Sequence, residues 1–198
     1  LDAINLERGI MKEAVGFQDQ TFASYGGLNL IKFHNEKEVA VEKINISAAR
    51  KEELEQSLLM YFTGLTRQAQ KIEEKKIENI RSNEKKLKTI LLQVDQGLNV
   101  LTGSGSLSRF GKLLDITWRE KRSLDRLVSN KKIDLMYREG VSAGALGGKL
   151  LGAGGGGFML FFVPPERKIK VRKALKDFNE VKFEIDAPGS SIIYSDNS

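Results

Sequence analysis

The 198-residue chain contains no cysteine, three prolines and a single histidine, His34. Without cysteine, disulfide bonds and thiolate metal sites are excluded, and one histidine cannot build a zinc site from a histidine cluster. No apolar run reaches the length of a membrane span, and the longest, Phe158 to Pro165, has the size of a strand. The first residues also lack the basic start and the apolar stretch of a signal peptide.

What the chain does contain is the composition of a soluble globular protein, with 40% hydrophobic and 29% charged residues, so a packed core is expected. The formal net charge of +6 suits phosphorylated small molecules or nucleic acid as partners. Much of that charge lies between Lys71 and Lys88, where lysine and arginine alternate with glutamate. Such alternation favours a solvated helix face over a nucleic-acid groove. Most aromatic residues are phenylalanines inside apolar runs, away from the basic residues.

The order of the predicted elements favours an α+β fold, because strands and helices do not alternate strictly. Glycine, proline and hydrophobic periodicity indicate where each element begins and ends. The predicted helices cover 1–15, 66–101, 107–128, 133–140 and 166–178, and the predicted strands cover 28–33, 39–46, 58–62, 158–163, 181–185 and 191–194. The region 48–53 is interpreted as a linker.

The most informative segment is the glycine run that begins at Lys149 and ends at Gly157. It is predicted to follow a helix and to open a strand, the reverse of a dinucleotide-binding turn, and it lacks the residues of a Walker loop. Glycines let a backbone approach a ligand closely, and successive free N–H groups can line an anion site. The alternative is a flexible connection, which rarely needs four consecutive glycines such as 154–157 because each costs backbone entropy.

A second polar segment, Gly16-Phe-Gln-Asp-Gln20, places a carboxylate between two amides just after a glycine. One interpretation is a capping cluster, because Asp is common at helix starts. The other is catalytic, since a single Asp can orient a substrate hydroxyl and accept its proton during phosphoryl transfer. The residues alone leave both interpretations open.

Both segments resemble motifs of the GHMP kinases, the family of galactokinase and of homoserine, mevalonate and phosphomevalonate kinases. Residues 140–163 resemble the third conserved motif of that family, and 16–20 resembles its Gly-x-x-Asp-Gln segment. The resemblance implies a GHMP-kinase-like C-terminal domain at 48–198, in which helices pack on an antiparallel sheet. It also implies that 1–47 is the last part of the N-terminal α+β domain.

The resemblance implies roles for individual residues as well. Asp19 corresponds to the expected acceptor of the substrate hydroxyl proton. Substrate contacts are expected at Gly16, Gln18, Arg67 and Lys121. The phosphate or active-site loop is expected to comprise Lys149, Gly152, Ala153, Gly154, Gly155, Gly156 and Gly157. No metal ligand is expected within this chain.

Within the family, the chain is most similar to the D-glycero-D-manno-heptose 7-phosphate kinases. The similarity rests on 61–67, on 110–114 with Trp118, and on 144–149. The branch usually carries a basic residue where this chain has Phe17. The similarity implies a cytoplasmic, ATP-dependent kinase that phosphorylates the anomeric hydroxyl of heptose 7-phosphate. The alternatives are a kinase of another hexose or small alcohol, of the galactokinase or mevalonate kinase type, and a non-enzymatic α+β module that binds RNA.

Further expectations concern the parts of the family pattern that have no equivalent in these residues. The main nucleotide loop of the family and the residues that hold Mg²⁺ are expected upstream of residue 1. ATP and Mg²⁺ are the expected cofactors, with a sugar phosphate as the substrate and no nucleic-acid or membrane partner. Alone, the chain is expected to be inactive in phosphoryl transfer. Apolar residues of its truncated edge, such as Leu30 and Val41, are expected to favour self-association.

Overall fold

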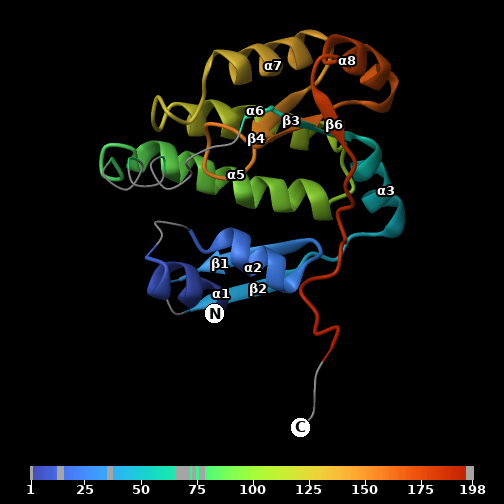
Figure 1. Ribbon diagram of the computed structural model, residues 1–198. Coiled ribbons are helices and arrows are strands. Elements are labelled where there is room, and N and C mark those ends of the chain that lie inside the picture. The colour runs from blue at the N-terminus through green and yellow to red at the C-terminus, as the bar shows by residue number, and fades with distance from the viewer. Residues whose placement is uncertain are drawn as a thin grey trace. The chain divides into compact units, whose positions relative to one another are not determined.

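The computed structural model describes residues 2–12, 16–34, 38–65, 72, 75 and 79–194, which fall into two compact units. The smaller unit comprises Leu1–Asn45 and Glu184–Ser198, and the larger unit comprises Ile46–Phe183. Both contain helices and antiparallel strands (Figure 1), which confirms the predicted α+β class. The predicted domain boundary between residues 47 and 48 stays a prediction. Unlike that division, the compact units join the C-terminal tail to the N-terminal segment.

In the smaller unit, short helical segments precede a pair of antiparallel strands. The elements are α1 (Asp2–Ile4), a π-helical segment (Asn5–Ile10), α2 (Gln18–Tyr25), β1 (Asn29–Phe33) and β2 (Val39–Lys43). β1 pairs with β2, as their apolar runs predict. The tail is fixed to this unit by a bridge between Gly26 and Pro188 and by the Ser190 N–H, which donates to the Ala23 carbonyl at 2.9 Å.

The larger unit is built on a four-stranded antiparallel sheet with the strand order β4-β5-β3-β6. Its elements are α3 (Ala48–Gln56), β3 (Leu58–Phe62), α5 (Glu84–Thr102), α6 (Ser108–Arg122), α7 (Lys131–Ser142), β4 (Gly147–Leu150), β5 (Phe158–Phe162), a 3₁₀ turn (Pro165–Arg167), α8 (Lys168–Ala174) and β6 (Asn179–Val181). The central strands β3 and β5 come from distant parts of the chain. Figure 1 shows α7 and α8 on one side of this sheet and α5 on the other.

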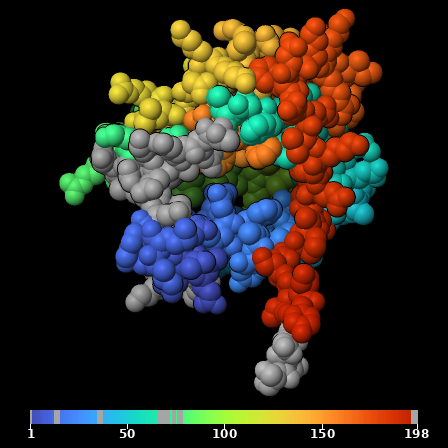
Figure 2. All heavy atoms as spheres, in the orientation of Figure 1, coloured from blue at the N-terminus to red at the C-terminus, as the bar shows by residue number. Residues whose placement is uncertain are grey.

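Alternate residues of the central strands face one packed core. Met159 and Phe161 of β5 are fully buried, and they cluster with Leu59 and Tyr61 of β3 and with apolar side chains of α7 and α8. Gly140 of α7 lies against the Phe161 ring, where an added Cβ would be 2.7 Å from a ring carbon. The side chains of α7 and α8 pack next to each other on the outside of the larger unit (Figure 2). This core holds the strands on either side of the glycine run.

Helix α6 lies close to the edge strand β4 because each element has a glycine, without a side chain, at the point of contact. An added Cβ on Gly147 would lie 2.1 Å from the Gly111 carbonyl oxygen, and one on Gly111 would lie 2.9 Å from the Phe162 ring. A side chain at either position would push the helix and the strand apart. The close contact brings the last turn of α6 within reach of the loop that follows β4.

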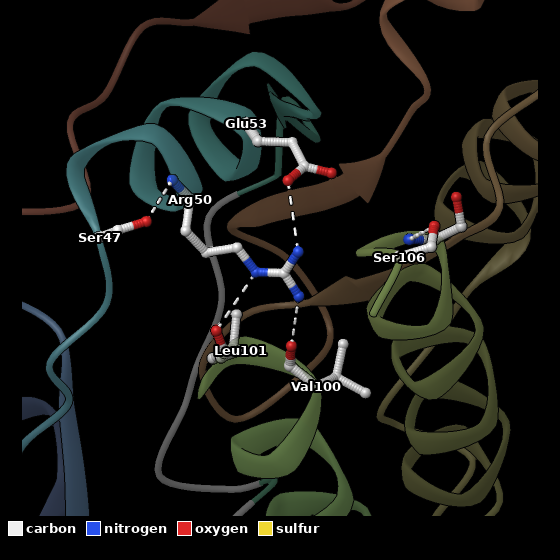
Figure 3. A network of polar contacts seen from close by, with 7 residues as sticks. Ser47, Arg50, Glu53, Val100, Leu101 and Ser106 are labelled. Atoms are coloured by element: carbon white, nitrogen blue, oxygen red, sulfur yellow. Dashed lines mark hydrogen bonds and ion pairs between the residues drawn. The ribbon is translucent and has the colours of Figure 1, made fainter. Parts of the chain in front are cut away.

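The region 48–53, interpreted from the sequence as a linker, is helical, so that interpretation is wrong. Ser47 caps α3 by accepting a hydrogen bond from the Arg50 N–H at 3.2 Å. The Arg50 guanidinium donates to the carbonyls of Val100, at 2.6 Å, and Leu101, at 3.3 Å, at the C-terminal end of α5 (Figure 3). These carbonyls have no partner within their own helix. The cap at Ser47 and the hydrogen bonds of Arg50 therefore stabilise this polar segment as a helix.

Other predicted boundaries are also wrong. The helix predicted over 66–101 is interrupted, because 79–83 forms turns and α5 begins only at Glu84. Asn83 is buried in these turns, where its amide donates to the Leu124 carbonyl at 2.9 Å. The helix predicted over 107–128 ends at Arg122, and 191–194, predicted to be a strand, has no regular structure.

Candidate active site

The glycine run forms the loop between two antiparallel strands, β4 and β5. Leu150 pairs with Met159 at the base of this loop. The prediction that the run directly follows a helix is therefore wrong, because Gly147 and Gly148 begin a strand. Glycine has little strand propensity, so the sequence carries no signal for β4. Both glycines fit there because α6 and the Phe161 ring leave no room for a side chain.

Hydrogen bonds from neighbouring segments hold the loop. The Gly155 N–H donates to the Val128 carbonyl at 2.8 Å, and the Gly157 N–H donates to the Leu65 carbonyl at 3.1 Å. The Gly157 carbonyl accepts from both the N–H and the hydroxyl of Thr63, each at 2.9 Å. The loop is thus anchored on several sides, which argues against a merely flexible connection.

Close packing against the protein backbone explains some of the glycines. Gly154 has a φ of 124°, and an added Cβ there would lie 2.8 Å from the Cα of Val128. At Gly156 an added Cβ would lie 2.6 Å from the Leu65 carbonyl oxygen. The sequence did not reveal this requirement, because it depends on which segments pack beside the loop. The role of the loop beside a substrate stays a prediction.

Three consecutive N–H groups of the loop lack an acceptor within the described residues. Within the part of the chain that the structure describes, the N–H groups of Gly152, Ala153 and Gly154 donate to no acceptor. Gly152 is exposed, whereas Ala153 and Gly154 are buried, and buried N–H groups in folded proteins nearly always have a partner. Successive N–H groups of this kind can bind an anion.

Two lysines lie beside the loop. Lys121, in the last turn of α6, is buried, and its ammonium donates to the carbonyls of Leu150, at 2.9 Å, and Gly152. The resemblance predicts substrate contact for Lys121, but these hydrogen bonds direct it into the backbone of the loop. Lys149 in β4 is half-buried, and desolvation lowers the pKa of its ammonium. An anion bound beside Lys149 would favour its charged form.

Asp19 lies in the first turn of α2, in the smaller unit. The N-cap residue of that helix is Phe17, which argues against Asp19 as a capping residue. Gln18 and Asp19 are exposed, and the N–H groups at a helix start favour a negative charge there. Gly16 is exposed as well, with nothing within 4 Å of an added Cβ. The buried Thr21 holds the turn through its hydroxyl, which donates to the Phe17 carbonyl at 2.7 Å.

A cation lies beside Phe17, the position at which the heptose kinase branch usually carries a basic residue. The guanidinium carbon of Arg8 lies 4.5 Å from the centroid of the Phe17 ring, within the range of a cation–π interaction. Sequence reasoning missed Arg8 because it belongs to a different helical segment. Its charge is nevertheless close to the turn that carries Asp19.

One predicted site residue is not located. Arg67, predicted to contact the substrate, lies outside the described residues. Among the residues that the structure does describe, no group of three or more His, Asp or Glu side chains gathers as a metal site would, so Mg²⁺ ligands are not assigned to them. Likewise, no helix in the described ranges has the length and apolar character needed to span a membrane.

The chain is similar in sequence and fold to known kinases. Residues 98–181 match the family model described as GHMP kinases C terminal. The D-glycero-alpha-D-manno-heptose 7-phosphate kinase of Campylobacter jejuni is 34% identical over 186 residues, which cover 88% of this chain and 52% of that protein. A solved D-glycero-D-manno-heptose 1-phosphate kinase from Bacteroides thetaiotaomicron aligns with a TM-score of 0.68 and 25% identity, covering 98% of this chain and 54% of its own.

The similarity of fold extends to other kinases. The structure of L. major mevalonate kinase in complex with R-mevalonate aligns with a TM-score of 0.64 and 24% identity, covering 80% of this chain and 47% of its own, which shows a shared fold. The chain spans about half the length of these relatives. The matches confirm the resemblance recognised in the glycine run, and residues 98–181 of this chain match the model of the C-terminal domain of the GHMP kinases.

Proposed function

We propose that this chain is part of an ATP-dependent kinase that phosphorylates a sugar phosphate, D-glycero-D-manno-heptose 7-phosphate, at its anomeric hydroxyl. The observation that carries the proposal is the 34% identity, over 88% of the chain, to the C. jejuni kinase named for heptose 7-phosphate. The solved heptose kinase that covers 98% of the chain supports the same substrate class. The likeness to mevalonate kinase is one of fold alone.

In the proposed reaction the anomeric hydroxyl oxygen attacks the γ-phosphorus of ATP, and the bond from that phosphorus to the ADP oxygen breaks. The hydroxyl proton passes to the Asp19 carboxylate. Asp19 suits this role because it is exposed in the first turn of α2, where helix N–H groups stabilise its charge. Gly16 precedes this helix and Gln18 is its first residue, and we assign both of them contacts to the sugar.

We assign the stabilisation of the transferred phosphoryl group to the glycine loop. The N–H groups of Gly152, Ala153 and Gly154 have no acceptor within the described residues. Preoriented N–H donors aimed at developing negative charge are among the strongest contributors to such catalysis. Lys149 adds a positive charge once an anion is bound beside it. Arg67 is a suitable clamp for the phosphate that the sugar already carries, because a guanidinium binds phosphate in a bidentate manner.

The proposed activity requires ATP with Mg²⁺, and the ligands of the metal are expected in residues that complete the enzyme upstream. This chain alone is therefore expected to show no ATP turnover. Calorimetric titration of the purified chain with ATP and Mg²⁺ checks this expectation. Affinity in the micromolar range would place the nucleotide site within these residues. The cytoplasmic location and the self-association of the apolar edge also stay predictions.

A substrate panel tests the proposed function. The complete enzyme is assayed with heptose 7-phosphate, galactose and mevalonate, and the position of the new phosphate is read by ³¹P NMR. We expect kcat/KM to be highest for heptose 7-phosphate, because a site built to pair the sugar phosphate rejects substrates that lack it. Equal or better use of galactose would refute the substrate assignment. Absence of turnover, together with RNA binding that weakens steeply with salt, would favour the binding module instead.

A further inference from the structure

The buried ammonium of Lys121 contacts the loop backbone rather than open space. The residue is 9% exposed, and its ammonium donates to the carbonyls of Leu150, at 2.9 Å, and Gly152. An ammonium has three donors, so two of them are directed at peptide carbonyls. The two contacts join the end of β4 to the start of the glycine loop. Lys121 is therefore placed to control the orientation of these peptides.

Because the peptide bond is planar, fixing the direction of a carbonyl also fixes the direction of the N–H that follows it. In a trans peptide the C=O and the N–H point in opposite directions, and no cis peptide occurs in the described residues. Because the Leu150 carbonyl points at Lys121, the Leu151 N–H points away from it, and it donates to the Phe158 carbonyl at 2.8 Å.

The same geometry holds one step further along the loop. The Gly152 carbonyl points at Lys121, so the N–H of Ala153 points away from the ammonium. Ala153 is only 8% exposed, yet its N–H meets no acceptor in the described part of the chain. Gly152 accommodates the turn because its φ of 69° is easily reached by glycine. A cation on the carbonyl also polarises the peptide, which strengthens the N–H at its other end as a donor.

We propose that Lys121 is a positioning residue, which holds the Gly152–Ala153 peptide so that the Ala153 N–H donates to an oxygen of the transferred phosphoryl group. The inference rests on the proposed function and replaces the expectation that Lys121 binds the sugar. The two roles differ kinetically. Loss of a donor aimed at charge in the transition state lowers kcat, whereas loss of a ground-state sugar contact raises KM.

Substitution of Lys121 in the complete enzyme separates these roles. Lys121→Met removes the cation and keeps most of the side-chain length. We expect kcat to fall about 10- to 100-fold, with the KM for the sugar phosphate within about twofold of wild type. Lys121→Arg keeps a cation and is expected to recover part of the lost kcat. Lys112→Met is the matched control, because Lys112 is an exposed lysine of the same helix. All variants are assayed below their measured unfolding midpoints.

A second readout does not depend on turnover. With ¹⁵N-labelled alanine, the Ala153 amide signal of this chain is followed during titration with inorganic phosphate. We expect a shift in the wild type that is absent from Lys121→Met. Unchanged kcat, a rise in KM alone, an Ala153 amide that ignores phosphate, or an equal shift in both proteins would overturn the inference. A wild-type enzyme that phosphorylates no alcohol would overturn the proposed function instead.

Discussion

The two compact units differ in how completely they bury apolar side chains. Among the described residues, every buried hydrophobic side chain, from Leu54 to Leu175, belongs to the larger unit. Among the described residues of the smaller unit, the buried side chain is that of Thr21, while Phe22 and Tyr25 are 51% and 63% exposed. Buried apolar area is the main source of folding free energy. The larger unit therefore has its own core, whereas the described residues of the smaller unit bury little apolar surface.

The candidate site residues are divided in the same way. The glycine loop and Lys121 belong to the larger unit, and Asp19 belongs to the smaller one. Core packing and several hydrogen bonds fix the geometry of the loop, whereas the described residues of the smaller unit include no buried hydrophobic side chain beside α2. We infer that the geometry of the glycine loop is preformed within the larger unit.

The largest effect is expected when one phenylalanine ring is removed from each unit in turn and the losses of stability are compared. Phe161→Ala deletes a fully buried ring of the larger unit and is expected to lower its free energy of unfolding by about 3–5 kcal/mol. Phe33→Ala deletes a ring that is 40% exposed in the smaller unit and is expected to cost no more than about 1 kcal/mol. Denaturant titration followed by the fluorescence of Trp118, the single tryptophan, reports the larger unit, and calorimetry reports both. Similar losses for the two variants would contradict the difference between the units.

A second prediction concerns the turnover of the complete enzyme after substitution of the exposed carboxylate of Asp19. Asp19→Asn keeps the size of the side chain and removes the proton acceptor, so kcat of the complete enzyme is expected to fall about 100-fold or more. Stability should change little, because Asp19 is exposed. Asp2→Asn makes the same change at another exposed position of the smaller unit and should leave kcat unaltered. Near-normal turnover of Asp19→Asn would remove Asp19 from the proposed role.

Alanine at Gly154 tests whether packing holds the glycine loop in place. Gly154→Ala places a Cβ 2.8 Å from the Cα of Val128 and forces alanine to a φ of 124°, so a loss of about 1–3 kcal/mol is expected. Gly105→Ala is the control, since nothing lies within 4 Å of its added Cβ, and it should stay within about 0.5 kcal/mol of wild type. Equal stabilities of the two variants, measured by thermal unfolding, would show that the loop can shift to accommodate a Cβ at Gly154 at little cost.

The sequence predicts best the elements whose own residues carry the signal. The apolar runs 58–62 and 158–163, both predicted as strands, form β3 and β5, and the structure shows that these strands pair with each other. Strand β4 could not be predicted, because Gly147 and Gly148 carry no strand signal and are placed by the packing of α6. Periodicity predicts a helix that includes α5, but it does not identify what the helix packs against, and Leu91 is 63% exposed.

The candidate site shows the same limit. The glycine run and Asp19 were recognised from local motifs, whose spacing is visible in the sequence. The direction of the Lys121 ammonium was not predictable, because it results from the packing of α6 on β4 and from the path of the loop beyond Leu150. The contacts of Gly154 with Val128 are likewise tertiary. Motifs therefore located the residues, and only the fold assigned their partners.

The smallest expected effect concerns an ion pair at the edge of the larger unit's sheet. The Arg172 guanidinium binds both oxygens of the Glu180 carboxylate, at 2.7 to 3.1 Å. The hydroxyl of the buried Tyr61 donates to the same carboxylate at 3.4 Å. Hydrogen bonding to Arg172 lowers the pKa of Glu180, against the opposing effect of its partial desolvation. Burial and the nearby Glu180 charge raise the pKa of the Tyr61 hydroxyl, which keeps it a donor.

Glu180→Gln is expected to lower the stability of the larger unit at neutral pH by no more than about 1 kcal/mol, because the pair is exposed to solvent. A carboxylate whose pKa is lower in the folded state stabilises the fold above its unfolded pKa, and the stabilisation is lost as pH falls through the folded pKa. The difference between wild type and Glu180→Gln should therefore shrink as pH is lowered below the ordinary glutamate pKa of about 4.3. Denaturant titrations across this pH range measure the difference in stability.

In an Arg172→Gln background the Glu180→Gln substitution should cost almost no stability, since the partner charge is gone. A cost that persists in that background, or that does not change with pH, would mean that packing against Tyr61, rather than the charge of Glu180, holds this edge of the sheet.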